Sequence, residues 1–348
     1  MASPAQRTLL GPGNGSLKAA AVLNRRELVT ICVAGSIVPA TAKTATYRVG
    51  QDGGLRVLPG SGGITLSHRV GDACVGIAGD HVEPGVSLRS PTRGPGRLKD
   101  GPNRALNVLA CVGNTARVTT GPACGARGVV TGKHGGVAHV MIDFPDRVLK
   151  RLRVGDTVQV EATGQGSRLE GFADVAVMNM GPSLLARWGV VVEHRRLIVP
   201  VTHCVPSSIM GSGLGRASAT HGDYDIQLFD PAVVARYRLA SLRFGDMVAI
   251  QNAEGRFGRS YRAGQVTIGI VVHSDSTVAG HGPGVTTLLA GPAKRFVLRA
   301  DRDANLAAML GLRRPVAPRR QRTLIRKTPT RSATFVQTTA IGGRNGTP

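Results

Sequence analysis

Short apolar segments alternate with glycine-rich turns along most of this chain, and this pattern predicts strands rather than helices. Glu27 to Ala34 is apolar and β-branched, and Gly264 to His273 is the strongest candidate for a buried strand. Tyr47 to Leu58 contains two short apolar runs around a Gln-Asp-Gly-Gly turn, which is typical of a hairpin. We therefore expect a mainly β fold.

Turn and helix signals support the same fold class, with a minor α+β contribution. Three Gly-Asp pairs each precede a strand-like run: Gly71-Asp72, Gly155-Asp156 and Gly245-Asp246. Glycine supplies an unusual backbone angle there, and the aspartate can bond to nearby amides. Asp230 followed by Pro231 is an N-cap and first-turn signal for a short helix.

The length of 348 residues predicts two or three domains, built here from several small subdomains. The GVVTGKHGG segment is similar to the turn of small SH3/KOW-like β-barrels, and we expect Lys133 and His134 to form an exposed hairpin tip that could touch an anion. The expected regions are a disordered N-terminus (1–26), an N-terminal β subdomain (27–113), a small β-barrel (114–165), a C-terminal β-rich subdomain with the main candidate site (166–293) and a basic, largely disordered tail (294–348).

The net charge of +23 is concentrated at the C-terminal end. From Lys294 onward there are 13 Lys or Arg and two acidic residues, a balance of +11. One interpretation is a disordered, solubilising extension. The other is an arm that binds the phosphates of a nucleic acid, although no aromatic residues are interleaved to stack on bases.

Five cysteines without a CxxC pair argue against a disulfide framework and favour a reducing compartment. The N-terminus lacks a signal-peptide pattern, and no run of 18 apolar residues occurs. We therefore expect a cytoplasmic protein with no membrane contact.

The chemistry-bearing residues gather in three glycine-rich segments, around positions 79–85, 200–230 and 273–284, and we expect these loops to meet in one pocket. His221, Asp223 and Asp225 are the candidate metal ligands, because two aspartates on alternate strand positions point to the same face. Imidazole with carboxylate suits a divalent metal such as zinc or manganese. The spacing matches no strong metal fingerprint, so a purely structural role for these residues also stays open.

Other residues of these loops are assigned to catalysis or ligand binding. Glu83 and His203 are the candidate catalytic proton carriers. The candidate ligand-binding residues are Asp80, His81, Gly211, Gly213, Gly215, His273, Asp275 and His281. The three glycines would expose backbone amides to an anion.

Many long motifs, among them DHVEPGVS, PVTHCVPSSIMGSGLG, GDYDIQLFD and GHGPGVTTL, together resemble the bacterial and archaeal family called domain of unknown function 4438, over roughly Glu27 to Ala290. The resemblance implies a mainly β protein of several small subdomains, one of them a barrel. It implies no activity and no catalytic residues.

Three functions remain open from the sequence. The leading one is a metal-assisted hydrolase or a protein that binds a small-molecule ligand in the pocket described above. The second is a nucleic-acid-binding module that uses the small barrel and the basic tail. The third is a structural homo-oligomer whose glycine-rich loops only pack.

Overall fold

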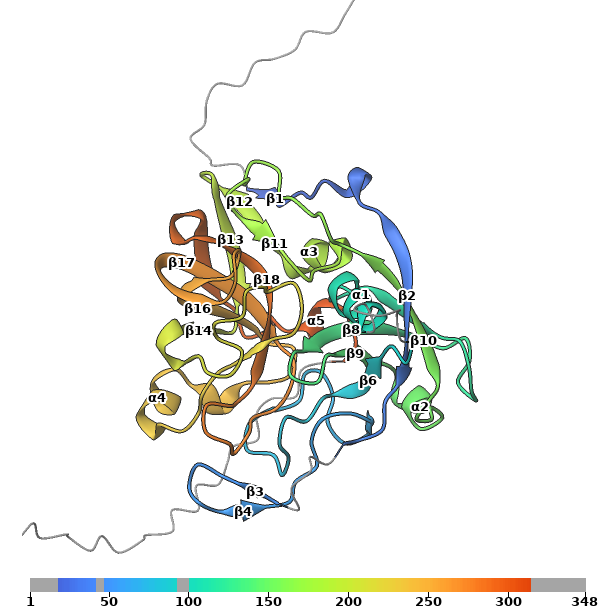
Figure 1. Cartoon of the computed structure of the whole chain (residues 1–348). Coiled ribbons are helices and arrows are strands. Elements are labelled where there is room, and N and C mark those ends of the chain that lie inside the picture. Colours follow the sequence, from blue (N-terminus) through green and yellow to red (C-terminus); the bar gives the residue numbers. More distant parts are fainter. Residues whose placement is uncertain (1–17, 42–46, 93–99, 314–348) are drawn as a thin grey trace, which may run out of the picture. The chain divides into compact units, whose positions relative to one another are not determined.

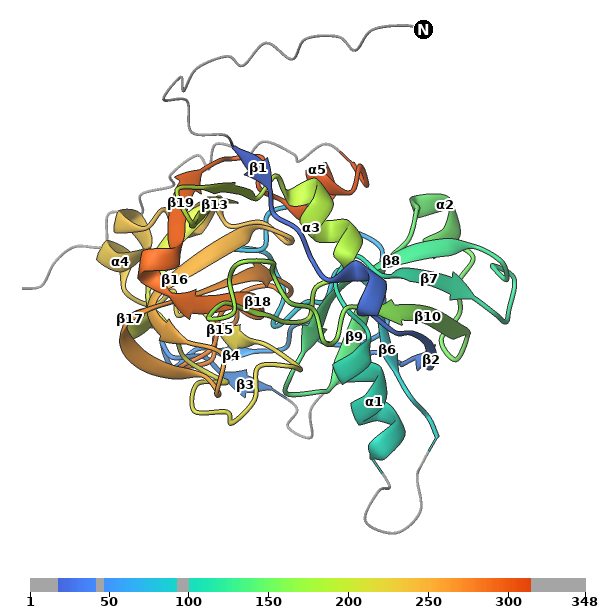
Figure 2. The ribbon, with the colours of Figure 1, turned by 90° about the horizontal axis from the view of Figure 1, so that it is seen from above.

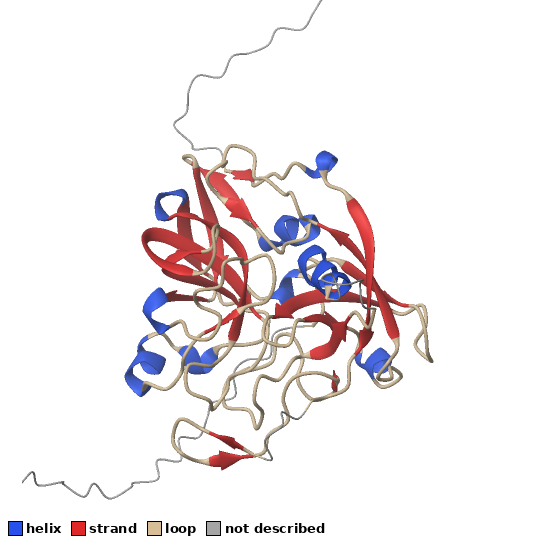
Figure 3. Ribbon diagram, viewed as in Figure 1, coloured by secondary structure: helices blue, strands red, loops and turns tan. Residues whose placement is uncertain are grey.

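The computed structural model describes residues 18–41, 47–92 and 100–313. Strands dominate these ranges and the helices are short, so the mainly β class is confirmed (Figure 3). Residues 1–17 and 314–348, for which disorder is predicted, lie outside the described residues. Among the described residues, no helix is long and apolar enough to cross a membrane.

The elements follow one another along the chain as strands with a few interspersed helices (Figure 1). The strands are β1 (Ala19–Ala20), β2 (Thr30–Ile37), β3 (Arg48–Val49), β4 (Leu55–Arg56), β5 (Ile64–Thr65), β6 (Gly85–Arg89), β7 (Thr115–Val118), β8 (Arg127–His134), β9 (His139–Asp143), β10 (Thr157–Thr163), β11 (Ala176–Val177), β12 (Val191–Glu193), β13 (Arg196–Val201), β14 (His203–Pro206), β15 (Tyr224–Asp225), β16 (Met247–Glu254), β17 (Ser260–Val271), β18 (Gly284–Pro292) and β19 (Phe296–Ala300). The α-helices are α1 (Gly101–Leu109), α2 (Asp146–Leu149), α3 (Pro182–Trp188), α4 (Pro231–Arg236) and α5 (Leu306–Met309).

A small closed barrel forms from the strand order β2-β10-β7-β8-β9-β6, and β6 pairs back onto β2 to complete the ring. Its interior is filled by aliphatic side chains and one phenylalanine, Phe144. The predicted boundary of this barrel at 114–165 is too narrow. The long strand β2 pairs with β10 over seven residues, and β6 pairs with β9, so residues from the expected N-terminal subdomain are part of the barrel wall.

The second large unit is a six-stranded sheet with the order β11-β18-β17-β16-β14, to which β15 adds by pairing with β18. It lies beside the barrel in both views (Figures 1 and 2). The two are joined where β8 meets β18, because Thr286 Oγ1 donates a hydrogen bond to the carbonyl of Lys133 at 3.0 Å. This junction between barrel and sheet positions the site described below.

A four-stranded sheet, β1-β12-β13-β19, uses both ends of the described chain. β19 pairs in parallel with β13, from Leu197 with Phe296 to Val201 with Ala300. The predicted start of a disordered tail at Lys294 is therefore too early, because β19 pairs with β13 over five residues and Phe296 is buried. At the other end, Ala19 and Ala20 pair with β12, so order begins before the predicted residue 27.

The predicted turn chemistry is present at all three Gly-Asp pairs. Each glycine has a positive φ, at 101°, 92° and 84° in chain order. Each aspartate accepts a hydrogen bond from the backbone amide three residues earlier, at 2.8 to 2.9 Å. Asp230 likewise caps α4, since its Oδ1 accepts from the amides of Ala232 and Val233.

Candidate metal centre

Imidazole and carboxylate groups converge where the barrel meets the six-stranded sheet. The barrel side contributes His81 from the loop before β6 and His134 from the end of β8. The sheet side contributes four residues on or beside β15, β17 and β18: Asp223, Asp225, His273 and His281. They form two groups of three residues, and each group has its ligand atoms within 4.8 Å of one another.

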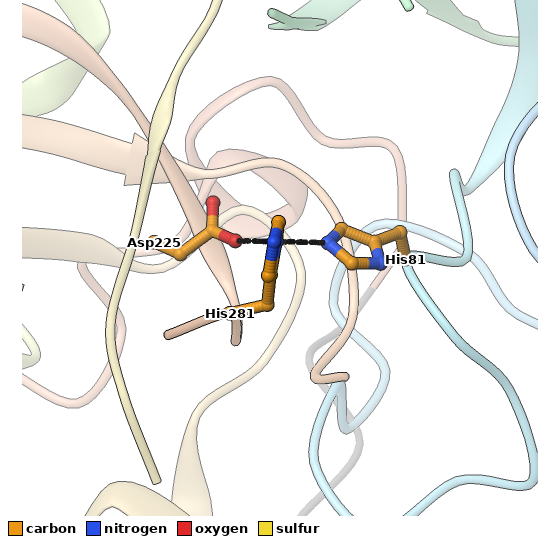
Figure 4. A group of neighbouring side chains, drawn as sticks. All are labelled: His81, Asp225 and His281. Atoms are coloured by element: carbon orange, nitrogen blue, oxygen red, sulfur yellow. Dashed lines mark hydrogen bonds and ion pairs between the residues drawn. The ribbon is translucent and has the colours of Figure 1, made fainter. Parts of the chain in front are cut away.

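The first group consists of His81, Asp225 and His281 (Figure 4). Nδ1 of His281 lies 3.0 Å from Nε2 of His81 and 3.2 Å from Oδ2 of Asp225. Nε2 of His81 lies 3.6 Å from the same carboxylate oxygen. Two ring nitrogens and one carboxylate oxygen thus face a common point.

The second group consists of His134, Asp223 and His273, all three buried. Nε2 of His273 lies 2.6 Å from Oδ2 of Asp223. Both atoms are shielded from solvent, and apart from this ion pair neither has a hydrogen-bond partner among the described residues. Buried polar atoms that face each other in this way are what a shared cation would satisfy.

Asp225 connects the two groups. Its Oδ2 faces the first group, as given above, whereas its Oδ1 lies 3.6 Å from Nε2 of His273 in the second. The imidazole rings are also close, with centroids 4.3 Å apart for His134 and His273 and 5.0 Å apart for His81 and His273. One carboxylate therefore presents an oxygen to each group, which is the arrangement of a bridging ligand.

Three of the histidines are held through their Nδ1 atoms. The Nδ1 of His81 lies 2.8 Å from the Asp80 carboxylate, and that of His134 lies 2.5 Å from the Glu83 carboxylate. The Nδ1 of His273 lies 2.9 Å from the backbone carbonyl of Ser274. Such acceptors bind the proton of Nδ1 and orient each ring so that its Nε2 faces the group, which is the usual support of metal-binding histidines.

Glu83 organises the barrel side of the site. It is 1% exposed and accepts hydrogen bonds from the amide of Gly62 at 2.7 Å and from the hydroxyl of Ser87. Its carboxylate also contacts His134 and His139. Burial by itself would raise the pKa of Glu83, but the two histidines outweigh it and hold the pKa well below its usual value. Glu83 therefore stays ionised and fixes the ring of His134.

Charge is balanced within the second group by an ion pair. Burial lowers the pKa of His273, yet the attraction of Asp223 and Asp225 outweighs it and raises that pKa well above the usual value. Burial raises the pKa of Asp223, and His273 reverses this shift, so its pKa is lowered. A cation shared by Asp223 and His273 would have to displace the proton of His273, so its affinity would fall as the pH falls.

Glycines allow the side chains of the site to approach closely. A Cβ at Gly284 would overlap Asp223 Oδ2 and His273 Nε2 and would lie 2.5 Å from His273 Cδ2. The amide of Gly135 donates to Asp223 Oδ1 at 2.7 Å. Position 284 requires the absence of a side chain, because the site fills the space that a Cβ would occupy.

The structure brings together parts of all three predicted loops, but it separates some of their residues from the two groups. His203 packs elsewhere, with Nδ1 at 2.9 Å from the hydroxyl of Thr202 and Nε2 at 3.1 Å from that of Ser241. His221 lies on the wall of the adjoining cavity but belongs to neither group. Asp275 faces away and accepts from the amide of Gly76 at 2.7 Å.

The predicted glycine loop, which contains Gly211, Gly213 and Gly215, supports the segment that carries the two aspartates. The amide of Gly211 donates to the carbonyl of Asp225 at 2.8 Å, and that of Gly215 donates to the carbonyl of Arg259 at 2.8 Å. Gly213, with φ 88°, lies against the backbone of Asp223 and Tyr224, where a Cβ would not fit. These contacts hold the segment that carries the two aspartates.

Two histidines of the site were not predicted, His134 and His139. The expectation of an exposed hairpin tip is wrong, because Lys133 is fully buried and His134 is 6% exposed. Strand β18 covers this end of the barrel, and Lys133 Nζ donates to Asn179 Oδ1 at 2.7 Å. The available signal was the pair of histidines on either side of the Gly135-Gly136 turn, one at the end of β8 and one at the start of β9.

A cavity of about 250 Å³ opens onto the two groups. Its wall includes His81, His134, Asp223, Asp225 and His281. Tyr47 and Val57, beside the strands of the β3–β4 hairpin, line its outer part. A small molecule can therefore reach the ligand atoms from solvent.

Comparison with known proteins identifies a family and a similar solved structure. The family model "Domain of unknown function (DUF4438), N-terminal" matches residues 47–186, and the model for the C-terminal part of the same family matches residues 187–310. The chain belongs to the DUF4438 family. A similar solved structure, titled "Crystal structure of TM1086", has a TM-score of 0.78 and 41% sequence identity, and the match covers 83% of this chain and 99% of that one. No curated protein matches the chain significantly.

Proposed function

We propose that this DUF4438 protein is a hydrolase that depends on a pair of divalent metal ions. The observation that carries the proposal is the convergence of histidine rings, three of them oriented by an acceptor on Nδ1, with Asp223 and Asp225. Imidazole with carboxylate oxygens fits zinc or manganese. The cysteines in the described structure are all unpaired, which supports the cytoplasm as the proposed compartment.

Each residue has a separate task in this proposal. His134, His273 and Asp223 would hold one ion, His81 and His281 would hold the second, and Asp225 would present one oxygen to each. Ions held there would supply a hydroxide from bound water at about neutral pH and would polarise the carbonyl or phosphoryl oxygen of a substrate. Asp80 and Glu83 act as positioning residues, because each orients a histidine and neither takes a place among the two groups.

Glu83 and His203, the proton carriers expected from the sequence, have no catalytic task in this proposal. Glu83 is occupied by His134 and His139, and His203 lies away from both groups. Nucleic-acid binding by the basic tail remains a prediction, since residues 314–348 lie outside the described structure. Homo-oligomer formation also remains a prediction.

Metal content tests the first half of the proposal. Full-length protein without an affinity tag, loaded with zinc or manganese and desalted, should retain close to two ions per chain in elemental analysis. His281→Ala should retain about one, and Asp225→Ala should lose most of both, because only Asp225 faces both groups. His194→Asn is the matched control, since His194 is exposed on the β12–β13 turn with φ 49°, which asparagine tolerates.

Hydrolysis tests the second half. Metal-loaded protein is assayed against p-nitrophenyl carboxylate and phosphate esters and a panel of amides, before and after chelation. Turnover that disappears on chelation, returns with metal and is absent from Asp225→Ala is the expected result. Failure to retain any metal would overturn the metal centre. If the metal is retained but no substrate of the panel is turned over in a metal-dependent way, the hydrolase assignment is overturned.

A further inference from the structure

Four arginines line the cavity beside the two groups, and they differ in their partners. Arg48 pairs with Asp80, and Arg56 pairs with Asp52 at 2.5 Å, so a carboxylate neutralises each of them. Arg216 and Arg259 form no ion pair with any carboxylate of the described residues. Two of the four guanidinium groups on this wall therefore have no carboxylate within ion-pair distance among the described residues.

Arg259 is the more unusual of the two, because it is 3% exposed. Its terminal nitrogens donate to the backbone carbonyls of Asp223 and His221, the latter at 3.1 Å, and its Nε makes no hydrogen bond to any described residue. Its guanidinium lies 5.1 Å from the ring centroid of Tyr224. A buried cation without a directly paired carboxylate is costly, and it is stabilised when an anion approaches.

Arg216 adjoins Arg259 on the same wall but is exposed. The amide of Arg259 donates to the carbonyl of Arg216 at 2.8 Å, so their backbones run side by side. The side chain of Arg216 makes no hydrogen bond with the described part of the chain. It is free to turn toward a ligand in the cavity, where a planar guanidinium binds carboxylate or phosphate through two parallel hydrogen bonds.

We propose that the substrate carries an oxyanion, a carboxylate or a phosphate, that Arg216 and Arg259 bind beside the metal centre. The proposal rests on the metal-dependent function for the position of the reacting bond, and it adds the class of molecule that the site selects. Two divalent ions with the carboxylates of Asp223 and Asp225 leave the centre positive, which further favours an anion. The cavity of about 250 Å³ is smaller than the 300–1,000 Å³ of sites for drug-sized ligands, so the substrate is small.

The test compares anion binding by four full-length proteins: the parent, Arg216→Gln, Arg259→Lys and Arg236→Gln. Arg236→Gln is the matched control, because Arg236 is exposed on α4 and is not part of the cavity wall. Inorganic phosphate and succinate are titrated separately by calorimetry into metal-loaded and chelated samples. The basic tail is present in all four proteins, so differences between them report on the cavity.

Arg216→Gln and Arg259→Lys should each lower the affinity for at least one of the two anions by about tenfold or more. The reason is that a charge-assisted hydrogen bond is lost or misaligned. The control should match the parent. The anion whose affinity falls identifies the oxyanion of the substrate as a phosphate or a carboxylate.

Equal affinity in the parent and Arg216→Gln would overturn the proposal, as would an equal loss in Arg236→Gln, which would assign the binding to overall charge. The chelated samples separate this outcome from failure of the metal centre. If the metal centre is wrong but the anion site is right, the difference in anion affinity between Arg216→Gln and the control persists in the chelated samples. If only the anion site is wrong, metal content stays at the parental value in all four proteins.

Discussion

Gly284→Ala should remove metal binding while leaving the fold intact. Gly284 begins β18 and does not have a positive φ, so the backbone accepts alanine. The obstacle is space, because the added Cβ would lie 2.5 Å from His273 Cδ2 and closer still to His273 Nε2 and Asp223 Oδ2. Side-chain carbons essentially never approach below 3.0 Å, so the ring must move by at least 0.5 Å.

That displacement is large on the scale of metal coordination, where ligand distances hold to within about 0.2 Å. We therefore expect a loss of affinity of about 100-fold or more, at the upper end of what changes around metal ligands cause. The packing strain itself should lower the free energy of unfolding by about 1–3 kcal/mol. A 100-fold loss of affinity corresponds to about 2.7 kcal/mol, which is comparable to the strain on the fold, so metal content and unfolding must be measured on the same protein.

The assay combines elemental analysis after metal loading with thermal unfolding followed by circular dichroism. Gly136→Ala is the matched control, because Gly136 lines the same cavity, has no positive φ and has no atom within 4 Å of an added Cβ. The control should keep the parental metal content and melting temperature. Parental metal content in folded Gly284→Ala would refute the argument that His273 and Asp223 are ligands held against this glycine.

Three further predictions concern the support of the site and its surroundings. Glu83→Gln should weaken metal binding about 10- to 100-fold, because His134 loses the carboxylate that orients it. Competition with a chelating dye measures this loss, and the variant should still reach full occupancy at excess metal. Protein in free metal at 100 times the dissociation constant should have a free energy of unfolding about 2.7 kcal/mol higher than chelated protein. Denaturant titrations measure this difference, and its absence would contradict a metal bound to the native state. Burial lowers the pKa of His203 from 6.5 to about 4, so the unfolded chain takes up the proton first and stability is lost as the pH falls from 6.5 to 4. The loss should reach about 3 kcal/mol, and His203→Gln should flatten this part of the profile of unfolding free energy against pH, whereas an unchanged slope would assign it to other groups.

Local features of the fold could be predicted where their cause is local. The Gly-Asp turns and the Asp230 cap depend on a backbone angle and on amides within three residues, so the sequence pattern is sufficient. The barrel boundary could not be predicted in the same way. Its closure depends on β2 pairing with β10, more than 100 residues away, and apolar periodicity does not specify which strand a strand will pair with.

The same distinction applies to the site. Asp223, Asp225, His273 and His281 stand out because polar groups in glycine-rich loops at strand ends are unusual, and the structure does bring them together. His134 could not be separated from an ordinary hairpin residue, because its burial is caused by β18, a strand from the far end of the chain. His203 has the same local signal as the others, but the parallel pairing of β14 with β16 carries it away from them.

The division of the ligand set between the two family regions has a genetic consequence. Each group of three takes one histidine from residues 47–186 and its other two members from residues 187–310. Neither region encodes a complete group, so the two regions form a single heritable unit with respect to this site. A gene split at residue 186 could restore the site only if both products were made in the same cell and reassembled, and a recombinant that exchanged one region would need a donor whose histidines meet the same pair of aspartates.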